Sequence, residues 1–188
     1  MTPNPRPRKV SLLIDYALLF YRRPMSETHS TDPVLQKLES VRRSLDLRLD
    51  EQGRWWHDGV AFEHPRIIEA FNRGIERHPD TNEPIVRVGE RWCYFHAELT
   101  PFFVRRMTIQ NEELRVLLNT GEKVFVPENG LFSREERIYV RFIDGREAVL
   151  DRQTQLGMSG LINPDGESLA IGSGARVWKI VDESSVTD

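Results

Sequence analysis

The sequence predicts an α+β protein that is rich in β-strands. Two segments have apolar side chains at the three- and four-residue spacing of amphipathic helices, and most of the remaining chain consists of short apolar runs separated by turn residues. The chain has 188 residues, enough for one large domain or two small ones. Hydrophobic residues make up 39% of it and charged residues 29%, so most of the chain is globular and not intrinsically disordered.

The first 24 residues differ from the rest in charge. They carry five basic residues against one acidic residue, a local charge of +4, so residues 25–188 carry −7 and the whole chain −3. Residues 10–21 include ten apolar residues, but a membrane-spanning helix needs about 20. Asp15 interrupts this run and no small-x-small cleavage site follows, which argues against a secretory signal. Two interpretations remain: a peripheral membrane anchor through residues 10–21, or an extension outside the fold, which we favour.

Two helices are expected, one beginning at Asp32-Pro33 and one at His64-Pro65, because proline fits the first helical position and Asp32 can cap the first helix. In each expected helix, apolar residues form a stripe along one side. The stripe residues are Leu35, Leu38, Val41 and Leu45 in the first helix and Ile67, Ile68, Phe71 and Ile75 in the second.

Turn sequences divide the rest of the chain into strands. Asp58-Gly59 and Asp144-Gly145 are hairpin signals because glycine, and aspartate more readily than most residues, accept positive φ. Gly59 and Gly121 are expected at positive φ. Residues 152–162 favour a helix only weakly, and a last hairpin is expected between residues 163 and 174. The expected strands cover residues 45–49, 54–57, 60–62, 85–88, 91–96, 102–109, 114–118, 123–126, 138–143 and 146–150.

Composition also bounds the function. A net charge of −3 gives no strong positive field, so nucleic acid is not an expected partner. The single cysteine, Cys93, cannot form an internal disulfide, which favours a cytoplasmic location.

The sequence matches none of the familiar catalytic or metal-binding patterns that we considered. Cys93 and His96 are three residues apart on an expected strand, hence on opposite faces, and we expect no metal site. Cys93 lies in an apolar strand, where cysteine is typically a small core residue. Residues 157–160 resemble a nucleophile elbow, but Leu161 stands where its second glycine belongs. No phosphate-binding loop occurs, so neither a cofactor nor a catalytic residue is assigned.

Arginines next to aromatic residues on expected strands are the most distinctive feature. Arginine binds phosphate or carboxylate through two N–H groups, and aromatic faces stack on planar rings, so the combination suits a nucleotide-like ligand. The competing interpretation is that the arginines line solvated sheet faces above an aromatic core. The pairs are Arg54 with Trp55 and Trp56, Arg91 with Trp92, Arg141 with Tyr139, and Arg176 with Trp178.

Four blocks of the sequence resemble the bacterial domain-of-unknown-function family 1285. The first has an Asp-x-x-Gly turn, an aromatic pair, a glycine before an apolar residue and a short helix with phenylalanine. In the second, Leu99 replaces an acidic residue of the family pattern. The resemblance covers residues 45–180. Its blocks are Asp50, Gly53, Trp55, Trp56, Gly59, Ile67, Ile68 and Phe71; residues 98–104; residues 119–122 with Pro127; and residues 139–152.

This resemblance implies two small related α+β halves, the second similar to pleckstrin-homology folds, with a nucleotide-type ligand between them. We place the halves at residues 25–105 and 106–188. The family implies no catalytic residue and has a suspected link to signalling. The candidate ligand-binding residues from its blocks are Trp56, Arg66, Asn119, Tyr139, Arg141, Glu147 and Arg152.

In this interpretation Trp56 and Tyr139 stack on a ring, the arginines pair with phosphate, and Asn119 and Glu147 bind sugar or base edges. The competing interpretation is structural: Asn119 shapes a turn, and Arg141 with Glu147 form a cross-strand ion pair worth under about 1 kcal/mol. We expect a binding or interaction module in cytoplasmic signalling. The alternative is an enzyme of unassigned reaction that uses carboxylates in the same cleft.

Overall fold

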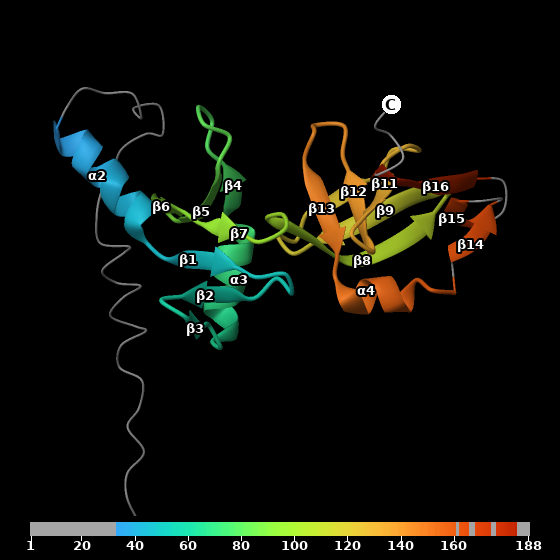
Figure 1. Ribbon diagram of the computed structural model, residues 1–188, viewed down its shortest axis with the longest axis horizontal. Coiled ribbons are helices and arrows are strands. Elements are labelled where there is room, and N and C mark those ends of the chain that lie inside the picture. The colour runs from blue at the N-terminus through green and yellow to red at the C-terminus, as the bar shows by residue number, and fades with distance from the viewer. Residues whose placement is uncertain (1–32, 161, 166–167, 174–175, 184–188) are drawn as a thin grey trace, which may run out of the picture. The chain divides into compact units, whose positions relative to one another are not determined.

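The computed structural model describes residues 33–160, 162–165, 168–173 and 176–183, and the predicted extension at residues 1–24 lies outside them. It confirms the predicted α+β, strand-rich fold class. In chain order the elements are α2 (Pro33–Ser44), β1 (Leu47–Leu49), β2 (Trp55–His57), β3 (Val60–Ala61), α3 (Pro65–Arg73), β4 (Ile75–Arg77), β5 (Pro84–Val88), β6 (Arg91–Tyr94), β7 (His96–Ala97), β8 (Phe102–Gln110), β9 (Glu113–Leu118), β10 (Lys123–Phe125), β11 (Leu131–Arg134), β12 (Arg137–Arg141), β13 (Glu147–Leu150), α4 (Arg152–Gly157), β14 (Ile162–Asp165), β15 (Ser168–Ser173) and β16 (Arg176–Asp182) (Figure 1).

Contacts between residues divide the chain into two compact units. Among the described residues, unit 1 comprises 33–48 and 56–96, and unit 2 comprises 49–55 and those from 97 to 183. Unit 2 is therefore built from two segments that are separated in the sequence.

The helix α2 contacts β6 through arginines. The guanidinium groups of Arg42 and Arg43 lie 3.9 Å from the ring centroids of Trp92 and Tyr94, respectively. Val41, which belongs to the predicted apolar stripe, is 47% exposed. Cation–π contacts therefore hold this helix to the sheet at positions that the apolar pattern did not indicate.

The second helix ends earlier than the sequence predicted. Gly74 follows α3, and a Cβ atom there would lie 1.9 Å from the carbonyl oxygen of Arg87. Ile75, expected on the helix stripe, instead begins β4 and pairs with Val86 in the three-stranded sheet β4-β5-β6. The prediction for Ile75 was wrong because the close approach of β5 to Gly74 ends the helix there.

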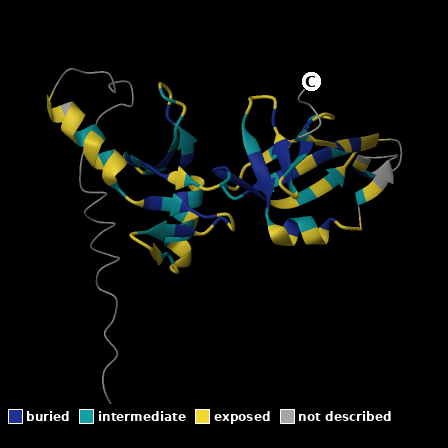
Figure 2. Cartoon of the chain, viewed as in Figure 1, coloured by how far each residue is buried: buried dark blue, intermediate teal, exposed yellow. Residues whose placement is uncertain are grey.

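The core of unit 2 lies in a nine-stranded sheet of order β10-β9-β8-β13-β12-β11-β16-β15-β14. Its strands carry most of the buried positions in the right half of Figure 2. Most neighbours are antiparallel, but β13 is parallel to β8 and β11 is parallel to β16. Along β9 and β16 buried residues alternate with more exposed ones, as expected for a strand with one face on a core. The buried apolar residues include Phe102, Val104, Leu114, Val116, Leu118, Leu131, Val140, Leu150, Ile171, Trp178 and Ile180.

Residues 49–55 pack against this sheet as part of unit 2. The Glu98 N–H donates to the Leu49 carbonyl at 3.0 Å, and Arg137 forms an ion pair with Glu51. A Cβ atom on Gly53 would lie 3.2 Å from the Phe103 ring. This short segment therefore belongs to the packing of β8 and β12.

The turns between strands are of two kinds. Gly59 and Gly121 have φ of +73° and +88°, which confirms the prediction of positive φ at both. The β11–β12 turn instead consists of Glu135 and Glu136, with φ of +51° and +62°. Because two glutamates are no hairpin signal, β11 was absent from the predicted strands.

The helix α4 is shorter than expected. Asp151 caps it by accepting a hydrogen bond from the Thr154 N–H at 2.7 Å. The helix ends at Gly157, and β14 then occupies residues 162–165, so the predicted helix boundary at 162 was wrong. Glycine weakens a helix interior, which agrees with an end at this position.

Candidate functional site

Two arginines and two glutamates form a cluster on one face of the nine-stranded sheet. We call Arg134, Arg141, Glu147 and Glu183 the arginine cluster. Arg141 and Glu147 lie directly opposite each other on β12 and β13, and Arg134 is the last residue of β11. Glu183 follows the last residue of β16, the strand parallel to β11.

Two stacked aromatic rings support the arginines. Phe132 and Tyr139 are opposite each other on β11 and β12, with ring centroids 5.3 Å apart and planes inclined by 16°. The Arg134 guanidinium lies 4.9 Å from the Tyr139 centroid, and that of Arg141 lies 4.5 Å from the Phe132 centroid. Both rings are buried, so the cluster has an apolar base and a partly exposed charged surface.

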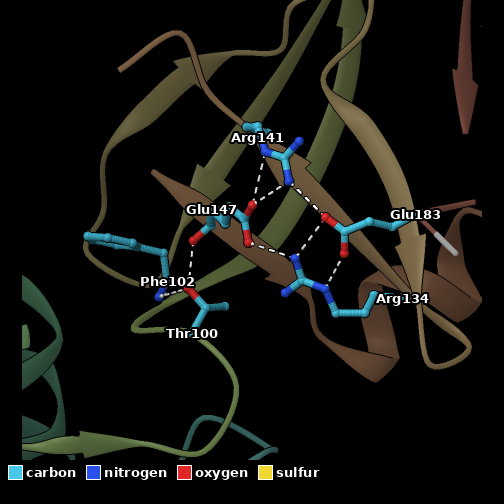
Figure 3. A network of polar contacts seen from close by, with 6 residues as sticks. All are labelled: Thr100, Phe102, Arg134, Arg141, Glu147 and Glu183. Atoms are coloured by element: carbon cyan, nitrogen blue, oxygen red, sulfur yellow. Dashed lines mark hydrogen bonds and ion pairs between the residues drawn. The ribbon is translucent and has the colours of Figure 1, made fainter. Parts of the chain in front are cut away.

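Figure 3 shows how the two carboxylates connect the two guanidinium groups. Arg134 donates to both carboxylate oxygens of Glu183, from Nε to Oε2 and from Nη2 to Oε1, the latter at 3.0 Å. Arg141 donates from Nη2 to Glu183 Oε1 at 2.9 Å and from Nε to Glu147 Oε1 at 2.9 Å. Arg134 Nη2 also reaches Glu147 Oε2 at 3.3 Å. Each glutamate therefore contacts both arginines.

The backbone of Glu147 is held in place by a buried threonine. Thr100 Oγ1 donates to the Glu147 carbonyl oxygen at 2.6 Å, and accepts from the Phe102 N–H at 3.5 Å. Phe102 pairs with Ala148 across β8 and β13. Glu147 is thus a fixed member of the cluster.

The ion pairs change the acid strength of the groups involved. The hydrogen bond from Arg134 lowers the pKa of Glu183 below its ordinary value. The bond to Glu183 raises the pKa of Arg134, and the bond to Glu147 raises that of Arg141. Burial raises the pKa of Tyr139. Glu183 therefore stays negative, Arg134 and Arg141 stay positive and Tyr139 stays neutral at neutral pH.

Each arginine retains one nitrogen for a further partner. The Nη1 atoms of Arg134 and Arg141 make no hydrogen bond or ion pair to any residue within the described ranges. Each Nη1 carries two N–H donors. The Arg134 side chain is 39% and the Arg141 side chain 50% exposed, so both arginines are partly accessible from solution.

The structure brings three of the seven candidate residues together, namely Tyr139, Arg141 and Glu147. Asn119 instead stabilises the β9–β10 turn: its Oδ1 accepts from the Phe103 N–H at 3.0 Å and its Nδ2 donates to the Pro101 carbonyl at 3.2 Å. Arg152 is the exposed first residue of α4. No contact among the described residues joins either of them to the arginine cluster.

The other two candidate residues belong to unit 1. Trp56 is a half-buried residue of β2, opposite Ala61 on β3. Arg66 is exposed in the first turn of α3. Whether all seven residues converge on one ligand stays a prediction.

Sequence reasoning missed Phe132, Arg134 and Glu183. Arg134 and Glu183 are 49 residues apart, and only the parallel pairing of β11 with β16 brings them together. The only local signal for β11 is the adjacent apolar pair Leu131 and Phe132 after Gly130, because Glu135-Glu136 is no hairpin signal. No local pattern marks Glu183.

Three other features bear on the function classes. Burial raises the pKa of the Cys93 thiol to about 12, which agrees with its interpretation as a core residue. Within the described ranges, no three His, Cys, Asp or Glu side chains are grouped as metal ligands. None of the helices in that part of the chain has the length and apolar character needed to cross a membrane.

Comparisons with known proteins yielded structural relatives alone. No family model matches the sequence, and no curated protein matches it. The crystal structure of a DUF1285 family protein from Silicibacter pomeroyi DSS-3 is similar with a TM-score of 0.55 and 14% identity, covering 77% of this chain and 84% of that one. A DUF1285 family protein from Shewanella baltica OS155 has a TM-score of 0.47 and 14% identity, covering 62% and 92%.

The first of these matches spans both units of the chain, and the identity is low enough that the likeness concerns the fold. It agrees with the resemblance found in the sequence blocks. The protein therefore resembles the DUF1285 family and shares the fold of its member from Silicibacter pomeroyi.

Proposed function

We propose that the protein is a ligand-binding module whose arginine cluster recognises the phosphate groups of a nucleotide-like small molecule. The observation that carries this proposal is the pair of half-exposed guanidinium groups, each with an Nη1 atom unbonded to any described residue. Planar guanidinium groups match the geometry of phosphate oxygens, and hydrogen bonds between charged groups are about twice as strong as neutral ones.

The aromatic base supports the same interpretation. Free arginine side chains lose considerable rotamer freedom on binding, but Arg134 and Arg141 are already held over Phe132 and Tyr139. A site that is organised before binding loses less entropy when the ligand arrives. Because the Tyr139 ring is 3% exposed, the guanidinium groups and not this ring would contact the ligand.

The enzyme alternative receives less support from the charges. A carboxylic acid that donates a proton near neutral pH needs a raised pKa. Arg134 lowers the pKa of Glu183, which is the opposite direction. We therefore favour binding without turnover, in the cytoplasmic signalling role expected from the sequence.

A thermal-shift screen tests this proposal. The purified chain is heated with ADP, GDP or inorganic pyrophosphate at constant ionic strength, and the melting temperature is compared with that of the unliganded protein. A ligand at one hundred times its dissociation constant stabilises the folded state by about 2.7 kcal/mol, roughly 5–10 °C for a chain of this size.

Arg141→Ala should abolish the ligand-induced shift and change the unliganded stability by less than about 1 kcal/mol, because exposed ion pairs contribute little. Arg146→Ala is the matched control, since Arg146 binds Glu122 and Asp144 and not the arginine cluster. A shift retained in Arg141→Ala but lost in Arg146→Ala would contradict the proposed site. Conversion of any ligand to product would favour the enzyme alternative.

A further inference from the structure

We infer that Glu183 is an internal occupant of the anion site, which a ligand must displace, and that it restricts the site to anions with more than one negative charge. This inference rests on the proposed function. It concerns the two carboxylates of the arginine cluster, which differ in how firmly the chain holds them.

Glu147 is a fixed partner. It lies within the sheet on β13, directly opposite Arg141, and Thr100 binds its carbonyl oxygen. Glu183 follows Asp182, the last residue of β16, and the described strand pairing with β11 ends at Asp182. Movement of the Glu183 side chain therefore breaks none of the described strand pairs.

Glu183 occupies the edge of Arg134 that an anionic ligand would use. Its two carboxylate oxygens accept from Nε and Nη2, which is the two-point contact that guanidinium groups make with carboxylates and phosphates. The Nη1 atom adds further donors beside this edge. A ligand that makes the same two-point contact with Arg134 has to replace the Glu183 carboxylate.

The charge of the cluster gives the class of ligand. With two arginines and two glutamates the cluster is neutral, and release of Glu183 leaves a net charge of +1. A tethered carboxylate acts at an effective concentration in the millimolar range or above, so a singly charged free carboxylate gains nothing by replacing it. A diphosphate gains, because it contacts the edge released by Glu183 together with the Nη1 donors of Arg134 and Arg141.

Calorimetric titration with inorganic pyrophosphate tests the inference. The wild-type chain is compared with Glu183→Gln at constant ionic strength, and circular dichroism and the melting temperature establish that each variant is folded. If Glu183 occupies the site nine-tenths of the time, the apparent dissociation constant is raised tenfold. Glu183→Gln should therefore bind pyrophosphate more tightly than the wild type, by about tenfold for that occupancy.

Glu122→Gln is the matched control. Glu122 binds Arg146 through both oxygens, at 2.8 and 3.0 Å, so this change removes the same charge from a similar ion pair outside the arginine cluster. Its affinity for pyrophosphate should equal that of the wild type. An equal gain in both variants would mean a general charge effect and would overturn the role of Glu183.

The remaining outcomes separate the inference from the proposed function. If the wild type and Glu183→Gln bind pyrophosphate equally well and Arg141→Ala does not bind it, the occupant role of Glu183 is overturned. The anion site itself is then retained. Absence of pyrophosphate binding in the wild type and in Glu183→Gln would overturn both. Tighter binding by Glu183→Gln alone supports both.

Discussion

At the scale of single residues, Gly74 and Gly121 are required for different physical reasons. Gly121 has a φ of +88°, and the space around its Cβ position is open, so only backbone strain opposes a side chain. Gly74 has ordinary backbone angles, but a Cβ atom would lie 1.9 Å from the Arg87 carbonyl oxygen. The requirement for glycine at position 121 can be predicted from a turn signal in the sequence. The requirement at position 74 depends on packing between α3 and β5, which the sequence does not indicate.

We predict that Gly121→Ala lowers the free energy of unfolding by about 1 kcal/mol, the strain of an L residue at positive φ. Gly74→Ala should lower it by about 3 kcal/mol or more, because the backbone of β5 must move. Urea unfolding of both variants measures the difference. Equal losses, or a larger loss for Gly121→Ala, would show that the approach of Arg87 to Gly74 is not limiting.

At the scale of elements, the turns explain which strands could be predicted. The hairpins at Asp58-Gly59 and Asp144-Gly145 carry the residues that positive φ favours, and strands were expected on both sides of each. The hairpin at Glu135-Glu136 has the same sign of φ without such residues. Its strand β11, and with it Arg134, was therefore missed.

This strained turn leads to a prediction of increased stability. Glu136 has a φ of +62°, a conformation that costs a residue with a Cβ atom roughly 1–2 kcal/mol. Glycine removes that cost and adds a smaller entropic loss of roughly 0.5–1 kcal/mol. Glu136→Gly should therefore raise the free energy of unfolding by up to about 1.5 kcal/mol.

Urea unfolding again provides the measurement for Glu136→Gly. Glu63→Gly is the control, because Glu63 is exposed and is not among the described residues with positive φ. It should show only the destabilising effect of glycine. Destabilisation of both variants to the same degree would mean that the β11–β12 turn carries no strain.

The candidate site shows the same division between local and distant information. Arg141 and Glu147 are six residues apart across one hairpin, and their pairing was among the interpretations available from the sequence. Arg134 and Glu183 are 49 residues apart, and their contact depends on the parallel pairing of β11 with β16. Register between distant strands is set by the whole core, which no short motif encodes.

At the scale of the whole molecule, the role of residues 1–24 stays a prediction. Their basic charge differs from that of the rest, and an isolated helix of about 12 residues is marginal in water. Deletion of these residues should change the melting temperature by less than about 2 °C, which is under about 1 kcal/mol for this length.

Calorimetry and liposome sedimentation of the full and shortened chains test this prediction together. A drop of several degrees on deletion would mean that residues 1–24 belong to the fold. Binding of anionic liposomes by the full chain alone would favour the peripheral anchor.

The two-segment construction of unit 2 has a consequence for the order of synthesis. Residues 49–55 pack with β8 and β12, yet the last strand of the same unit ends at residue 182. Ribosomes add about 5–20 residues per second, so roughly 6–25 s pass between these two parts of the chain. Residues 49–55 are therefore made before their partners in β8 and β12, and the unit can close its core only after β16 has been made.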